Sequence, residues 1–133
     1  MTGTIINAAY QVHKAVGPGL LESVYDACLA AELRHQEIDF LRQVEIPIFY
    51  RDIELLSGLR LDFLIFERVV VELKAVEIVL PVHKAQLLSY IRLANKPVGL
   101  LINFNVAVLR EGVSRIINPS HPDVRSLASP QPD

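Results

Sequence analysis

The sequence predicts an α/β domain in which a central mixed β-sheet is flanked by helices. Apolar residues recur at helical spacing over the first 36 positions, whereas later segments are rich in β-branched residues and include wholly apolar runs. The chain has 133 residues, of which 51% are hydrophobic, and a chain of roughly 150 residues buries most of its apolar surface in one core. We therefore expect one domain over residues 1–117, followed by a flexible, Pro- and Ser-rich C-terminal tail over residues 118–133.

Two helices open the predicted domain. The first runs from Thr2 to Val16, and Gly17-Pro18-Gly19 stops it, because glycine and proline interrupt helical hydrogen bonding. The second covers about Leu20 to Gln36. Within it, Glu22 and Tyr25 are neighbours on one face by the i, i+3 rule, so the two side chains are expected to act together.

Strand-forming segments follow the second helix. The segment Phe40 to Tyr50 alternates in part, and Pro47 indicates an edge position or a bulge, because proline cannot donate a ladder hydrogen bond. Two further strands, about Leu59 to Phe66 and Val69 to Val76, flank a short turn near Glu67-Arg68. This arrangement predicts an antiparallel hairpin.

The last third of the domain supplies one more helix and two more strands. Pro81 is well placed to open a helix that continues to about Ala94, because proline is tolerated in a first turn. Val98 to Phe104 then has the composition of a buried strand, and a weaker strand covers Val113 to Ile117.

The composition restricts the possible functions. The net charge of −2 gives no general attraction to polyanions, so any contact with nucleic acid must be local. Cys28 is the only cysteine, which excludes an internal disulfide and a multi-cysteine zinc site. We expect a cytoplasmic protein, because no apolar run approaches the roughly 20 residues that span a bilayer and no secretory signal pattern is evident.

Three charged residues stand out because they lie inside the predicted apolar hairpin. They are Asp62, Glu72 and Lys74. Burying a charge is costly unless it is paired or binds a metal. Since strand side chains alternate, Glu72 and Lys74 point to one face. If the hairpin is centred on Glu67, Asp62 lies opposite Glu72, within roughly 5.5 Å. A two-residue turn would instead place Asp62 on the wrong face, so this cluster requires an odd-length loop or a bulge.

Two carboxylates and an ammonium group in one place suit phosphodiester chemistry. Paired carboxylates are ligands for a hard divalent cation such as Mg²⁺, with Mn²⁺ as an alternative. Lys74 could then orient or deprotonate a water molecule, or stabilise charge in the transition state. The competing interpretation is a structural ion pair between Lys74 and either acid.

The same residues resemble the PD-(D/E)XK nuclease superfamily. Asp62 followed, after an apolar spacer, by Glu72-Leu73-Lys74 is similar to its defining motif, although leucine rather than proline precedes Asp62. The run Gly19-Leu20-Leu21-Glu22-Ser23-Val24-Tyr25 is similar to the signature of the GxxExxY family within this superfamily. Gln86-Leu87-Leu88-Ser89-Tyr90 resembles the Gln-x-x-x-Tyr helix motif of recombination-type exonucleases.

This resemblance implies a restriction-endonuclease-like core and a role for each matching residue. Asp62 and Glu72 would be metal ligands, and Lys74 would be the catalytic lysine. Glu22 would reach the metal directly or through water. Gln86 and Tyr90 would border the site and orient Lys74 or a substrate phosphate, unless they only pack the helix against the sheet.

The implied function is Mg²⁺-dependent hydrolysis of phosphodiester bonds in DNA or RNA. One alternative is a non-catalytic interaction module that retains the nuclease fold, and another is a structural protein held together by ion pairs. His13 and His83 lack a short metal-ligand spacing, which favours packing or surface roles. Homo-oligomers are possible through an exposed edge strand at Phe40 to Tyr50, although Pro47 argues against uninterrupted pairing.

Overall fold

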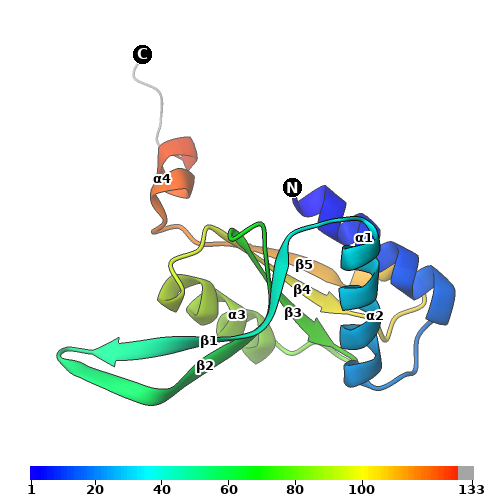
Figure 1. The fold of residues 1–133 in the computed structure, drawn as a ribbon, viewed down its shortest axis with the longest axis horizontal. Coiled ribbons are helices and arrows are strands. Elements are labelled where there is room, and N and C mark those ends of the chain that lie inside the picture. The colour runs from blue at the N-terminus through cyan, green and yellow to red at the C-terminus, as the bar shows by residue number, and fades with distance from the viewer. Residues whose placement is uncertain (129–133) are drawn as a thin grey trace.

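The computed structural model describes residues 1–128. Within them, one five-stranded sheet has the strand order β1-β2-β3-β4-β5 (Figure 1). Helices α1 (Thr2–Val16) and α2 (Glu22–His35) cover one face, and α3 (Pro81–Leu93) covers the other. The expected α/β class, with a restriction-endonuclease-like mixed sheet flanked by helices, is confirmed.

The sheet combines antiparallel and parallel pairing. Its strands are β1 (Phe40–Tyr50), β2 (Ile53–Ile65), β3 (Val69–Lys74), β4 (Val98–Asn103) and β5 (Val113–Ile117). Only β3 and β4 pair in parallel, across the α3 crossover, while the other neighbours are antiparallel. A short 3-10 helix, η1 (Leu109–Gly112), precedes β5, and helix α4 (Pro122–Ala128) follows it.

Two apolar clusters hold the layers together. Odd-numbered β3 residues, Val69, Val71 and Leu73, pack with α1 and α2, whereas Val70 packs with Leu87 and Ile91 of α3. All six β4 residues are buried, as expected for a strand covered on both faces. Gly99 allows the close approach of α3, since a Cβ at this position would lie 2.9 Å from the Leu87 side chain.

The helices predicted from the sequence are confirmed within one or two residues at each end. Gly17 ends α1 with a φ of 70°, a conformation that glycine adopts without steric strain. Pro47 lies on the edge strand of the sheet, and the β1–β2 register shifts between Ile46 and Ile48. The prediction of an edge position or a bulge is therefore correct on both counts.

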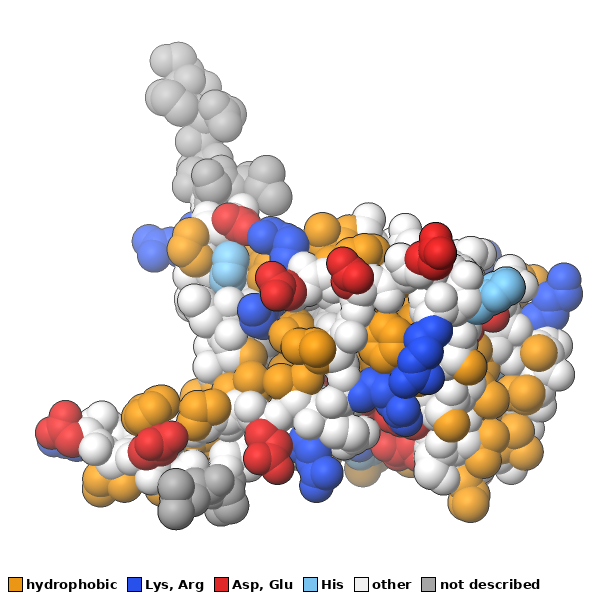
Figure 2. All heavy atoms as spheres, viewed as in Figure 1, with side chains coloured by type: hydrophobic (Ala, Val, Ile, Leu, Met, Phe, Trp, Pro, Cys, Tyr) orange, Lys and Arg blue, Asp and Glu red, His pale blue; other side chains and the backbone are white. Residues whose placement is uncertain are grey.

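Strand β2 begins at Ile53, six residues earlier than predicted, and pairs with β1 into a long two-stranded arm. The arm projects from the body of the molecule (Figure 1). Near its tip Phe49, Tyr50 and Ile53 are more than half exposed, and apolar side chains are visible along it in Figure 2. The sequence did not reveal this arm.

The segment after β5 is anchored at its start. The buried amide of Asn118 donates to the carbonyl of Lys96 at 3.0 Å, and α4 follows. Residues 129–133, part of the segment expected to be flexible, lie outside the described residues, so flexibility of the tail stays a prediction. Among residues 1–128, no helix has the length and apolar character needed to cross a membrane.

Candidate active site

The hairpin between β2 and β3 has the register that the site requires. Ile65 pairs with Val69, and Phe63 pairs with Val71, so the hairpin is centred on Glu67. Its three-residue loop contains Phe66 and Glu67, both with a φ of 57°. This odd-length loop places Asp62 and Glu72 at equivalent positions on the two strands, as the sequence interpretation assumed.

Where β2 and β3 separate, the side chains of Asp62 and Glu72 take the place of backbone carbonyls as hydrogen-bond acceptors between the two strands. Regular pairing ends at Phe63 and Val71. Beyond it, Glu72 Oε1 accepts a hydrogen bond from the Asp62 backbone N–H at 3.1 Å, and Asp62 Oδ2 accepts one from the Leu73 N–H at 2.9 Å. Each carboxylate is thus fixed by a main-chain N–H of the opposite strand.

A change of side-chain direction in β2 accompanies this separation. Leu61 and Leu64 both pack in the α3-side cluster, whereas Phe63 packs on the α1 and α2 side. Regular alternation would place Leu61 and Phe63 on the same face. On the adjacent strand, Gln43 has a φ of 51° and is skipped in the register. Asp62 therefore lies at a kink that directs β2 away from β3.

The environment of Glu72 disfavours a second negative charge. Burial and, next, the nearby charge of Asp62 together raise the pKa of Glu72 to about 9, although the hydrogen bond from the Asp62 backbone and the charge of Lys74 act in the opposite direction. In the absence of a cation, the pair therefore holds a proton near neutral pH. A divalent cation bound between the two carboxylates would offset their mutual repulsion and allow both to ionise.

Lys74 ends β3 on the same face as Glu72. Its carbonyl accepts a hydrogen bond from the Phe104 N–H at 2.9 Å, which fixes the strand end. In the described part of the chain, the Lys74 ammonium makes no ion pair within 4.0 Å. The geometry therefore gives no support to a structural ion pair between Lys74 and either acid.

Glu22 begins α2 beside this cluster. Burial raises the pKa of Glu22, the charge of Lys74 lowers it, and Asp62 and Asp26 raise it. Glu22 is thus within electrostatic range of both Lys74 and Asp62. Among the described residues, however, no three His, Cys, Asp or Glu side chains lie close enough to share one metal ion. The expectation that Glu22 reaches the metal directly or through water therefore stays a prediction.

Helix α3 presents Gln86 and Tyr90 to the acids. The Gln86 amide donates to the Tyr90 hydroxyl at 2.7 Å. The pKa of Tyr90 is raised mainly by burial and next by the charge of Glu72. Tyr90 therefore borders the cluster and is held by Gln86, as the i, i+4 spacing suggested.

Comparisons with known proteins place this arrangement in a family. The family model described as the PD-(D/E)XK nuclease superfamily matches residues 1–116. The chain belongs to this superfamily. No curated protein and no solved structure matches the sequence. Membership in the PD-(D/E)XK superfamily indicates a nuclease, a class that binds nucleic acid and generally uses divalent metal ions.

Tyr25 has a different role in this PD-(D/E)XK chain from the one expected. Its side chain is fully buried and stacks on Phe104, with ring centroids 4.5 Å apart. Its hydroxyl donates to the Gly17 carbonyl at 2.6 Å and accepts from the Leu20 N–H at 3.2 Å. Tyr25 therefore clamps the loop that leads into Glu22, and the expectation that both side chains act from one helix face is corrected.

Removing this clamp gives a testable effect. Tyr25→Phe keeps the stack on Phe104 but loses both hydrogen bonds, so we expect the free energy of unfolding to fall by about 1–2 kcal/mol. Chemical denaturation measures this loss. Tyr10→Phe is the control, because Tyr10 is 51% exposed on α1. Equal stability of the two variants would contradict the clamp.

Other polar residues near the superfamily site have structural partners. His13 Nε2 lies 2.7 Å from the Val106 carbonyl, and His83 Nδ1 accepts from the Leu80 N–H at 3.0 Å. Both contacts agree with the packing roles favoured from the sequence. The buried Asn103 side chain exchanges hydrogen bonds with the Val76 main chain at 2.9 and 3.0 Å. It ties the segment after Lys74 to the end of β4.

Proposed function

We propose that this protein is a divalent-metal-dependent nuclease of the GxxExxY family, hydrolysing phosphodiester bonds in DNA or RNA. The observation that carries the proposal is the reciprocal fixation of Asp62 and Glu72 by each other's strands, beside Lys74, which forms no ion pair with any residue in the described range 1–128. The order of Gly19, Glu22 and Tyr25 supports the GxxExxY assignment.

The donor set fits Mg²⁺ or Mn²⁺. Asp62 and Glu72 each commit one oxygen to a backbone N–H, and within residues 1–128 no backbone N–H donates to their second oxygens. Hard divalent cations prefer such oxygen ligands and retain several waters. Asp62 and Glu72 would hold the ion, and Glu22 would contact it through water. When bound, the ion would polarise the scissile phosphate and make an attacking water more acidic.

The other residues then have separate tasks. The Lys74 ammonium would stabilise the charge that develops on the phosphate oxygens in the transition state. Gln86 would hold the Tyr90 hydroxyl toward the substrate phosphate, since the two side chains already form a pair. Glu22, with its raised pKa, would hold a proton or a water molecule at the opening of α2.

A nuclease assay tests this proposal. Purified protein is incubated with single-stranded, double-stranded and branched DNA and RNA, with Mg²⁺, with Mn²⁺ or with a chelator. We expect metal-dependent cleavage of at least one substrate, and Asp62→Asn should reduce it by at least about a hundredfold.

Asp52→Asn is the matched control, because Asp52 is an exposed acid at the tip of the arm between β1 and β2. This variant should cleave at the wild-type rate. Cleavage that persists in the chelator, or that survives Asp62→Asn unchanged, would refute the proposed site.

A further inference from the structure

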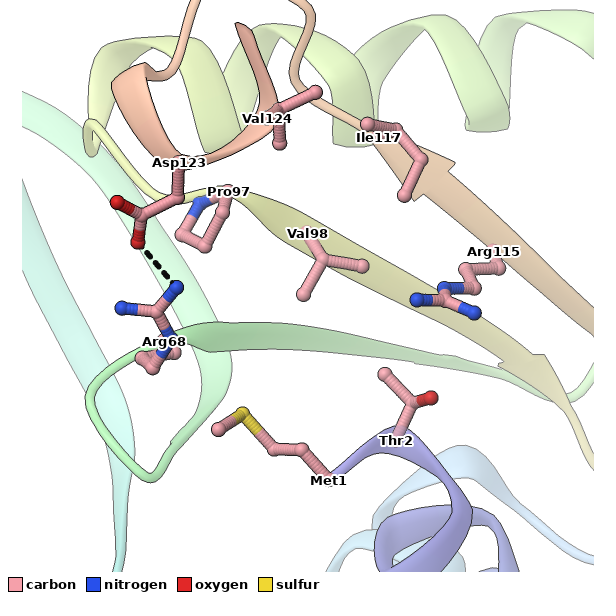
Figure 3. A pocket seen from close by; sticks show the side chains of 9 residues that line it. All are labelled: Met1, Thr2, Arg68, Pro97, Val98, Arg115, Ile117, Asp123 and Val124. Atoms are coloured by element: carbon pink, nitrogen blue, oxygen red, sulfur yellow. Dashed lines mark hydrogen bonds and ion pairs between the residues drawn. The ribbon is translucent and has the colours of Figure 1, made fainter. Parts of the chain in front are cut away.

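A hollow lies at the start of β4, on the α1 and α2 side of the sheet (Figure 3). Its volume is about 460 Å³, within the range of roughly 300–1,000 Å³ typical of small-molecule sites. Val98, at the start of β4, lines it, whereas Asn103, next to Lys74, ends the same strand. Five residues of extended strand place the two regions roughly 16 Å apart.

The floor of this hollow is apolar. Val98 and Ile117 are cross-strand partners on β4 and β5, so their side chains share a face of the sheet. Pro97 and Val124 extend the apolar surface toward α4 (Figure 3). Ile117 remains 42% exposed. Val98 is only 9% exposed, so Ile117 supplies more of the exposed hydrocarbon surface on this floor than Val98 does.

The rim carries two arginines with different environments. Arg68 forms an ion pair with Asp123, drawn as the dashed contact in Figure 3. Arg115 extends over the hollow from β5, and within residues 1–128 it has no ion-pair or hydrogen-bond partner. Arg115 is thus a positive side chain of this hollow that has no partner among residues 1–128; Met1, at the N-terminus of the chain, also lines the hollow.

The two ends of the hollow differ in charge. At the α4 end, Asp123 is already paired with Arg68, so the two charges offset each other and this end offers little attraction to an anion. Arg115 lies at the other end, beyond Ile117 (Figure 3). An anionic group would therefore bind at Arg115, where the planar guanidinium can donate two parallel hydrogen bonds. Its hydrocarbon part would extend over Val98 toward Val124.

We infer that this hollow binds a small amphipathic anion, with its acidic group on Arg115 and its hydrocarbon chain on Val98 and Ile117. The site is separate from the nuclease centre and does not depend on it. Its occupant has both parts: a neutral hydrocarbon would leave Arg115 unused, and an inorganic anion would leave the apolar floor exposed to water.

A heteronuclear NMR titration with octanoate tests this inference. We expect saturable chemical-shift changes at Val98, Arg115 and Ile117. The neutral analogue octanamide should bind at least about tenfold more weakly, because it lacks the charge that pairs with the guanidinium. Arg115→Gln should weaken octanoate binding by a similar factor.

Arg110→Gln is the matched control, because it removes the same charge from an exposed arginine outside this hollow. It should leave octanoate binding unchanged. Equal binding of octanamide and octanoate, an equal effect of both substitutions, or shifts that never saturate at these residues would each overturn the inference.

Discussion

Lys74→Met is expected to lower the rate of cleavage by at least about a hundredfold while leaving the fold intact. The Lys74 ammonium forms no ion pair within 4.0 Å among the described residues, so its loss breaks no ion pair of that kind. Methionine preserves much of the aliphatic side chain at the end of β3. The rate is measured under single-turnover conditions, and circular dichroism checks the fold.

Lys14→Met is the control for this substitution, because Lys14 is an exposed lysine in the last turn of α1. It should cleave as the wild type does. A Lys74→Met protein that cleaves normally would remove Lys74 from the mechanism. A variant that unfolds would show instead that the lysine is structural.

Glu72→Gln is expected to have opposite effects on activity and on stability. Cleavage should fall by at least about a hundredfold, because glutamine is a weaker ligand for a divalent ion. In metal-free buffer at pH 7, the free energy of unfolding should rise by about 1–3 kcal/mol, because glutamine keeps the acceptor oxygen and avoids the free-energy cost of protonating Glu72 on folding. Chemical denaturation in a chelator measures the second effect.

The sign of the pH dependence follows from the raised pKa. The Glu72 carboxyl keeps its proton up to about pH 9 in the folded protein, whereas its ordinary value is 4.5. Between these values the unfolded chain binds fewer protons than the folded one, so this group makes stability fall as pH rises. In Glu72→Gln this contribution is absent, and its stability should decline less from pH 5 to pH 9.

Glu77→Gln is the matched control for both effects, because Glu77 is an exposed acid five residues further along the chain. It should change neither cleavage nor the pH profile. Reduced stability of metal-free Glu72→Gln would favour the competing view that Glu72 forms a stabilising ion pair.

Much of the fold could be predicted because local patterns determine it. Gly17 ends α1, Pro81 opens α3, and the wholly apolar β4 occupies the covered centre of the sheet. The long arm was missed because its first half, from Ile53, gains its strand hydrogen bonds from β1 and not from its own composition. Gly58 also weakens the strand signal, although it permits close approach to the Ile46 backbone.

The candidate site was predictable in its residues but not in its detailed geometry. The alternation of strand side chains placed Glu72 and Lys74 on one face. The three-residue loop of the hairpin confirmed the assumed register, in which Asp62 lies opposite Glu72. The sequence pattern does not reveal the kink in β2, because the apolar residues Leu59, Leu61, Phe63 and Ile65 alternate with the others as in a regular strand. In the structure they nevertheless divide between the two faces of the sheet. Tyr25 was misassigned because i, i+3 spacing gives neighbours on a helix but not the depth at which each side chain is buried.

Calorimetric titration with Mn²⁺ tests the central claim most directly, namely that Asp62 and Glu72 together hold a catalytic divalent ion. Wild-type protein should bind Mn²⁺ saturably, and both Asp62→Asn and Glu72→Gln should weaken this binding by at least about tenfold. Asp52→Asn should bind as the wild type does. The claim would be contradicted if the folded wild type did not bind Mn²⁺, or if Asp62→Asn and Glu72→Gln bound it as tightly as the wild type does.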